Sequence, residues 1–196
     1  MKACYLPVLL LHNLDPSWPP QDIQDCHAAV HLLKDALIEV GHPIQEVCVQ
    51  SDELETHLEG VNPNQHLIFN WCEELPGIPR SASQVAQILD RMGFTYTGAS
   101  ADALAFSQDK PQVKVSLRAQ GITTSQWQIS TTASSDSWDC FPAIVKPALE
   151  HCSFGVARDA VVLSPVELAG RVHYVLETFQ QTALAAERHP KFRLDG

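Results

Sequence analysis

The residues best suited to chemistry stand in one segment of the second half of the chain. An apolar strand, residues 144–147, carries Lys146 and runs into a polar loop, residues 148–155, that contains Ser153 and Gly155. A lysine at the end of a buried strand, followed by such a loop, can hold a polyphosphate with one point charge and several backbone N–H groups. The alternative is an edge lysine that only blocks strand aggregation. Taken alone, the segment leaves both interpretations open.

Other chemistry-bearing residues are less well placed for a site. His27 and His31 stand four apart on a predicted helix, as two metal ligands can, but no third ligand is evident, which favours surface histidines. Cys72 and Cys152 lie in candidate loops without a sequence-evident base, which favours ordinary thiols over nucleophiles. No G-x-G-x-x-G follows the first strand and no G-x-x-x-x-G-K-[ST] occurs, so a dinucleotide oxidoreductase is disfavoured. No metal ligand is predicted within the chain.

A parallel sheet is predicted to position the first candidate loops. Residues 3–11 have the apolar continuity of a buried strand, and the apolar residues from Ile23 to Val40 recur at spacings of three and four, which indicates one face of a long helix. Further strands are predicted at 44–49, 67–70 and 94–97, with a short helix from Ser51 and an amphipathic helix over 81–92. Because ligand loops lie at the carboxyl ends of parallel strands, function is expected in residues 12–20 and 70–80.

The character of the chain changes after residue 106, which predicts a domain boundary there. Helices are predicted over 100–106 and 109–120, and then strands at 124–129 and 143–145 flank a Ser- and Thr-rich stretch that favours a hairpin-like connection. The last helix begins at Ser164 with residues in capping-box order, and it buries Leu168, Val172, Val175 and Phe179. Beyond Gln180 the sequence predicts a polar tail without strand alternation.

Composition excludes several classes of protein. Thirteen Lys and Arg against 23 Asp and Glu give a net charge of −10, which argues against a dedicated nucleic-acid surface. The longest uncharged apolar run, residues 3–11, is far shorter than the ~20 residues that span a bilayer, so no membrane partner is expected. The six cysteines form no C-x-x-C pair, which predicts a reducing, cytoplasmic setting.

Several short motifs, in this order, resemble the D-alanyl-D-alanine ligase branch of the ATP-grasp family. A strand ends in Phe69-Asn70, residues 93–100 read GFTYTGAS like the family's GIPYTGS turn, and Asp109-Lys110 opens the next helix. Residues 121–124 look like the family's GIPTP step, and residues 144–147 look like its VKP strand. The resemblance covers residues 4 to 180, and an ordered set of weak motifs is more specific than any one of them.

This resemblance implies an α/β fold with two parts. Residues 1–106 would form a pre-ATP-grasp domain with a parallel, Rossmann-like sheet, and residues 107–196 would form a small α+β lid subdomain of the ATP-grasp fold. It implies a carboxylate–amine ligase that works through an acyl phosphate, with ATP, Mg²⁺ and small amino-acid-like substrates as its ligands. A homodimer is kept as a candidate assembly.

The resemblance also assigns roles to residues. It implies that Lys110, Lys146, Glu150, Ser153 and Gly155 bind ATP, and Ser153 is further expected to take part in catalysis.

Residues 70–73 resemble an FN.xE segment of the family, which implies that Asn70 and Glu73 lie beside the substrate cleft. Arg80 is then a candidate clamp for a carboxylate. Glu73 and Arg80 are both predicted to be catalytic residues. For Glu73, Glu74 and Arg80, a solvated loop is the alternative, because exposed charges are the default.

Some features depart from the family's pattern. His151-Cys152-Ser153 stands where the family has Gly-Ser-Ser, and residues 13–18 replace its glycine-rich substrate loop, so the substrate stays open. No VEEFI.GRE-like strand follows residue 184, so the ligands of Mg²⁺ are expected in a C-terminal subdomain that this chain lacks. The chain is therefore expected to be inactive alone. The alternative function is a non-catalytic module that binds a nucleotide or another protein.

Overall fold

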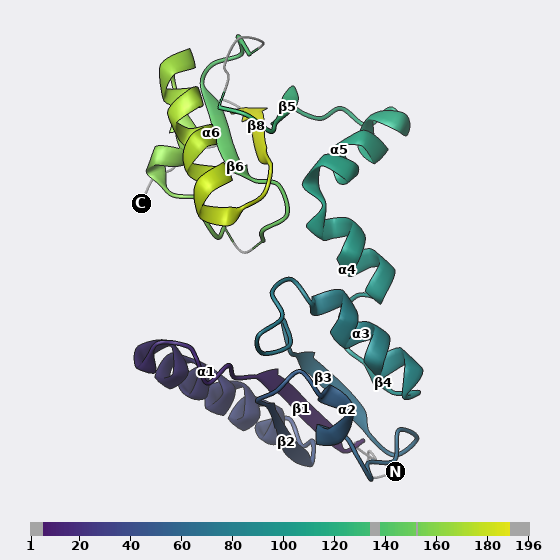
Figure 1. Cartoon of the computed structure of the whole chain (residues 1–196). Helices are drawn as coiled ribbons and strands as arrows, with labels where there is room; N and C mark the ends of the chain where they lie inside the picture. The colour runs from purple at the N-terminus through teal and green to yellow at the C-terminus, as the bar shows by residue number, and fades with distance from the viewer. Residues whose placement is uncertain (1–5, 134–137, 152, 189–196) are drawn as a thin grey trace. The chain divides into compact units, whose positions relative to one another are not determined.

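The structure of the chain is a computed structural model that describes residues 6–133, 138–151 and 153–188. It divides into two compact units, Met1–Ala105 and Phe106–Gly196, and each unit has a four-stranded sheet of its own (Figure 1). None of the helices in these described ranges is long and apolar enough to cross a membrane.

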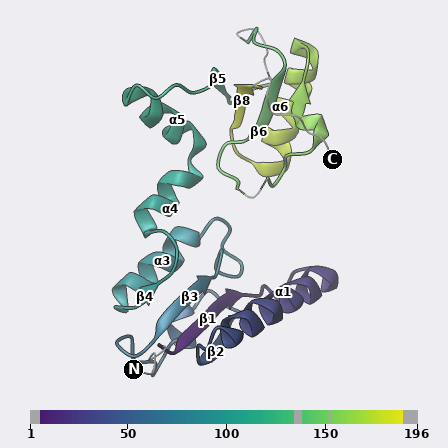
Figure 2. The same ribbon diagram turned by 180° about the vertical axis from the view of Figure 1, so that it is seen from behind.

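The first unit is built on a parallel sheet in the order β2-β1-β3-β4, with β1 between β2 and β3 (Figures 1 and 2). Its strands are β1 (Val8–Asn13), β2 (Ile44–Val49), β3 (Leu67–Trp71) and β4 (Thr95–Tyr96). Its helices are α1 (Pro20–Glu39), α2 (Leu54–His57) and α3 (Ala82–Arg91), and α4 (Ala101–Gln108) follows at the boundary. The alternation of strands and helices in the sequence thus gives the parallel sheet that it predicts.

The central strand β1 is buried over its whole length. The sequence predicts a strand over residues 3–11, of which residues 3–5 lie outside the described residues. The structure begins the strand at Val8 and continues it through His12 and Asn13, which the sequence assigns to a loop. These two polar residues fit in the strand because each side chain has a partner: His12 Nε2 lies 3.3 Å from Glu46 Oε1, and Asn13 Oδ1 accepts the Glu73 N–H at 3.0 Å.

The two faces of this sheet have different covers. One face packs against α2 and α3 through a core of apolar side chains that includes Leu9, Leu11, Ile68, Val85 and Leu89. Side chains alternate along a strand, so Leu10 and His12 point to the opposite face, where α1 contributes its one buried residue, Val30. The apolar side chains predicted to line one face of α1, from Ile23 to Leu37, are half-buried or buried in the structure. Val40, the last of the predicted set, is exposed.

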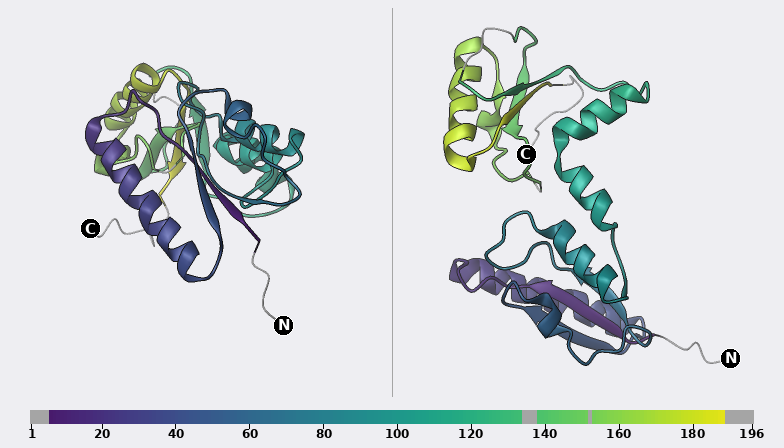
Figure 3. Two further views of the ribbon diagram at one scale, coloured as in Figure 1. Left: turned by 90° about the horizontal axis from the view of Figure 1, so that it is seen from below. Right: turned by 45° about the vertical axis from the view of Figure 1, so that its right-hand side comes forward.

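The second unit is an antiparallel sheet in the order β5-β8-β6-β7, with α6 lying along it (Figure 3). Its strands are β5 (Trp127–Ser130), β6 (Ala143–Pro147), β7 (Val161–Val162) and β8 (Ala183–Glu187). Its helices are α5 (Lys110–Ala119) and α6 (Pro165–Phe179), with a short 3-10 helix over Arg158–Ala160. As predicted, Ser164 caps α6, and its Oγ accepts the Glu167 N–H at 3.3 Å.

Two sequence predictions are wrong in this sheet. The predicted polar tail after Gln180 contains strand β8, and this strand lies between β5 and β6, so those two strands form no hairpin. The sequence hides β8 because its first four residues are all buried, and a strand that is buried on both faces shows no alternation of apolar and polar residues. A strand therefore does follow residue 182, although it lacks the expected motif.

Candidate functional site

Lys146 lies on β6 with its side chain on the face opposite α6. Ala143 and Val145 belong to the core that α6 covers, so Ile144 and Lys146 point the other way by strand alternation. The side chain is half-buried, and burial lowers the pKa of its ammonium group. The cation is therefore poorly solvated, and an anion beside it would be favourable.

Lys110 begins α5 and reaches toward the same place. The N-cap residue Asp109 accepts the Gln112 N–H at 2.9 Å and fixes the start of the helix. The Lys110 ammonium donates to the carbonyls of Pro147 at 3.3 Å, Ala148 at 3.4 Å and Glu150. Burial lowers the pKa of Lys110, and the charge of Lys146 lowers it further. The two lysines are thus close, as the prediction of a shared cleft requires.

Lys114 is a third cation, near Lys146, that none of the sequence motifs indicates. Its ammonium donates to Thr124 Oγ1 at 2.8 Å and to Ser125 Oγ at 3.1 Å. Burial lowers its pKa first, and the charges of Lys146 and Arg118 lower it further. The available signal was its position one helical turn after Lys110, which puts the two side chains on one face of α5.

The loop after β6 borders a cavity of about 270 Å³ whose lining includes Lys110, Lys146, Glu150 and Ser153. Gln181 holds the start of the loop, since its Oε1 accepts the Leu149 N–H at 2.7 Å and its Nε2 donates to Glu150 Oε1 at 2.7 Å. Four of the five residues predicted for ATP therefore meet at one cavity.

Gly155, the fifth predicted residue, supports the loop rather than lining the cavity. It has a φ of +71°, and a side chain there would overlap the Phe179 ring. Its carbonyl accepts a hydrogen bond from Arg171, a residue only 7% exposed whose Nη1 also donates to Asp159 Oδ2 at 2.9 Å. Cys152, in the same loop, lies outside the described residues.

Glu73 belongs to a second cavity, in the first unit, of about 220 Å³ at the carboxyl ends of β1 and β3. Its lining includes His12, Trp18, Trp71, Glu73 and Glu74.

Arg80 is on the same loop as Glu73 but is not among the described residues that line this cavity. It has a φ of +62°, and its backbone N–H donates to Glu74 Oε2 at 3.3 Å. Asn70, which was expected beside the cleft with Glu73, is also not among the described lining residues, and its Oδ1 accepts the Cys72 N–H at 3.2 Å.

Cys72, His27 and His31 are the remaining residues that the sequence singles out for nucleophile or metal chemistry. Burial raises the pKa of the Cys72 thiol to about 12, which leaves almost no thiolate at neutral pH. His27 and His31 are exposed on α1. Across residues 6–133, 138–151 and 153–188, no group of three or more His, Cys, Asp or Glu is arranged to hold a metal ion.

Comparisons with known proteins give relatives of the chain, although no protein-family model matches it. The chain is 30% identical to the uncharacterised protein y4sG of Sinorhizobium fredii, over 87% of this chain and 49% of that protein. It is also 30% identical to a D-alanine–D-alanine ligase of Aquifex aeolicus, over 75% of this chain and 47% of that ligase. The chain therefore spans about half the length of the curated relatives it matches.

Solved structures show the same fold. A D-alanine–D-alanine ligase from Bacillus anthracis complexed with ATP matches 95% of this chain and 58% of that chain, with a TM-score of 0.69 and 16% identity. One from Helicobacter pylori matches 95% and 68%, with a TM-score of 0.67 and 16% identity. The predicted fold class, a parallel α/β part followed by a smaller α+β part of the ATP-grasp fold, is confirmed.

Proposed function

We propose that this chain, a D-alanine–D-alanine ligase-like member of the ATP-grasp family, supplies the ATP-binding residues of a carboxylate–amine ligase. In such a reaction ATP phosphorylates a carboxylate, and an amine then displaces phosphate from the acyl phosphate. The observation that carries the proposal is that Lys110 and Lys146 line one cavity, with Lys114 near Lys146, in a chain whose net charge is −10. Clustered, half-buried cations in an acidic protein favour a polyanionic ligand.

The chemistry of these donors fits the phosphates of ATP. The charge of Lys146 lowers the pKa of Lys110 and of Lys114, so each of these two ammonium groups is repelled by Lys146 in a partly desolvated space. An anion placed among them would remove this cost and gain charge-assisted hydrogen bonds. Phosphoryl transfer itself spreads negative charge over oxygen atoms, which fixed cations stabilise without reorganising.

We assign the roles as follows. Lys110 and Lys146 hold phosphate oxygens, and Lys114 strengthens the positive potential beside them. Ser153 and the backbone N–H groups of the loop bind the same phosphates, while Glu150 and Gly155 hold the loop in shape through Gln181 and Arg171.

On the substrate side, Glu73 and Arg80 of the first unit are proposed to act on the carboxylate and amine partners. The first unit is then the pre-ATP-grasp domain and the second the lid subdomain.

Magnesium is treated separately, because a magnesium site usually takes one or two protein carboxylates besides phosphate oxygens. The described part of the chain offers no cluster of acidic residues placed for a metal, so we derive no step through Mg²⁺. The half-buried lysines suit equally a second candidate function, a module that binds a nucleotide without catalysis.

Titration calorimetry with ATP tests the proposal on the full chain. Lys146→Ala is expected to weaken ATP binding by about tenfold or more, because it removes a charge-assisted contact. Arg91→Gln, which removes a cation from α3 in the other unit, is the matched control and should leave binding unchanged. Equal ATP affinity in all three proteins would contradict the proposal. Phosphate release from ATP with magnesium and a panel of amino acids then separates a ligase from a binding module.

A further inference from the structure

Arg171 is a cation among the buried side chains of α6. The buried residues of this helix are Leu168, Arg171, Val172 and Val175, and Arg171 is only 7% exposed. Residues three or four apart share one face of a helix, and this buried face is otherwise apolar. Arginine is almost never this buried without a partner, so its contacts indicate what it does.

Three contacts hold the guanidinium group of Arg171 in place. Its Nη1 donates to Asp159 Oδ2 at 2.9 Å, in the short 3-10 helix, and its Nη2 donates to the carbonyl oxygen of Gly155. Its central carbon lies 4.3 Å from the centre of the Tyr174 ring. Gly155 is the last residue of the loop over 148–155, which we call the phosphate loop. Arg171 therefore links the buried face of α6 to the end of that loop.

The burial of this cation opposes the stability of the second unit. The Asp159 side chain is 70% exposed, so the ion pair compensates only part of the hydration that the guanidinium loses. Arg171 Nε is also buried, and it has no hydrogen-bond partner within the described structure. An apolar side chain of similar length would avoid both costs, and it would leave Asp159 in contact with water rather than buried and unpaired. Stability alone therefore favours an apolar residue at position 171.

The phosphate loop needs an external contact at its end. Ser153 has a φ of +59° and Gly155 a φ of +71°, and this left-handed conformation is unfavourable for serine. The Val156 N–H donates to the Ser153 carbonyl at 2.9 Å and closes a turn over these residues. Unfavourable backbone conformations persist only where surrounding contacts hold them. The hydrogen bond from Arg171 to the Gly155 carbonyl is such a contact, two residues from Ser153, which lines the cavity.

We propose that Arg171 is a positioning residue for ATP binding, kept at a cost to stability. Its hydrogen bond to the Gly155 carbonyl fixes the turn that presents Ser153 and the backbone N–H groups of the phosphate loop to the ligand. The inference rests on the proposed function, because it takes the ligand of the loop to be the phosphates of ATP. It goes further in one respect: replacing Arg171 should change stability and ATP binding in opposite directions, which loss of an ordinary structural contact would not do.

Arg171→Met in the full chain tests the proposal, because methionine keeps a long side chain but has neither the charge nor the donor. Its melting temperature should equal or exceed that of the unchanged chain, whereas its ATP affinity in calorimetry should fall by about threefold or more. Arg171→Lys keeps a cationic donor and should bind ATP more tightly than Arg171→Met. His173→Met, at an exposed position of the same helix, is the control and should change neither quantity.

The amide nitrogen of Val156 gives a readout that needs no ATP, because Val156 shares a peptide group with the Gly155 carbonyl. Its nitrogen-15 resonance should shift in Arg171→Met and stay in place in His173→Met. A lower melting temperature of Arg171→Met, an unshifted Val156 resonance or an unchanged ATP affinity would overturn the inference. If the unchanged chain does not bind ATP, the proposed function is refuted instead, and the melting temperature and the Val156 resonance still decide whether Arg171 fixes the loop at a cost to stability.

Discussion

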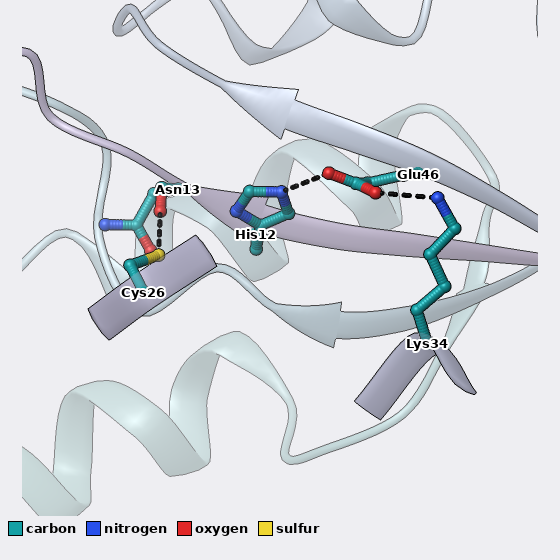
Figure 4. A network of polar contacts seen from close by, with 5 residues as sticks. All are labelled: His12, Asn13, Cys26, Lys34 and Glu46. Atoms are coloured by element: carbon teal, nitrogen blue, oxygen red, sulfur yellow. Dashed lines mark hydrogen bonds and ion pairs between the residues drawn. The ribbon is translucent and has the colours of Figure 1, made fainter. Parts of the chain in front are cut away.

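The cavity lined by His12 in the first unit and the cavity lined by Lys110 and Lys146 in the second unit differ in the charged side chains that line them. In the first unit Lys34 and Glu46 form an ion pair (Figure 4), and the cavity is lined by His12, whose Nδ1 has no hydrogen-bond partner in the described structure, together with carboxylates and indoles. In the second unit Lys110, Lys114 and Lys146 stand together, and the pKa of each is lowered. The two linings thus differ in charge, with the carboxylates of Glu73 and Glu74 in the first unit and the ammonium groups of Lys110 and Lys146 in the second.

The largest expected effect tests whether the two units are stable independently. Leu184 is fully buried on β8, and Leu184→Ala should cost about 2–5 kcal/mol of the free energy of unfolding of the second unit. Hydrogen exchange should show faster opening of β5, β6 and β8 and unchanged protection of β1. Leu10→Ala is the matched variant and should act only on the first unit. Equal loss of protection in both units from either change would contradict their independence.

The next effect concerns the loop that borders the lysine cluster. Gly155 has a left-handed backbone and abuts the Phe179 ring, so Gly155→Ala should cost about 1–3 kcal/mol of stability. ATP affinity should fall with it, because the loop carries Ser153 and the backbone donors.

Gly170→Ala is its control, because a side chain at position 170 meets no atom within 4 Å and Ala favours a helix. Unchanged stability and unchanged ATP affinity in Gly155→Ala would show that the loop geometry is irrelevant to binding.

The smallest expected effect compares one substitution in the two units. Burial lowers the pKa of Lys146, so its protonated form opposes folding, and stability of the second unit should rise as the pH increases toward 10.5. Lys146→Met removes this cost and should raise the melting temperature of that unit by about 1–3 °C at neutral pH. Lys34→Met removes the ion-pair partner of Glu46 and should lower the melting temperature of the first unit. Shifts of the same sign would break the comparison.

The sequence predicted best where a pattern reports one buried face. The amphipathic run over residues 81–92 became α3, with Val85, Ile88 and Leu89 buried, and the strand over 44–49 was found at its predicted bounds. The sequence did not predict strand β8, because a strand that is buried on both faces shows no alternation of apolar and polar residues. The predicted hairpin between β5 and β6 was wrong because strand order depends on pairing between segments that are distant in the sequence.

The site residues of the second unit were easier to predict from the sequence than those of the first unit, because they belong to recognisable motifs. Lys110 and Lys146 were found through motifs, whereas Lys114 needed the helix face it shares with Lys110. The His12–Glu46–Lys34 chain could not be predicted from single residues, because it joins three elements. The register that pairs Leu10 with Glu46 puts His12 and Glu46 on one face of the sheet and within reach of each other.

The central claim is that the lysine cluster of the second unit binds the phosphates of ATP. The most direct measurement is NMR of the lysine side chains during a titration with ATP, recorded over a range of pH. The account predicts that the resonances of Lys110, Lys114 and Lys146 shift together and that their pKa values rise toward 10.5, while the resonance of Lys34 stays in place. Unchanged signals for the three lysines, or an equal shift of Lys34, would contradict it.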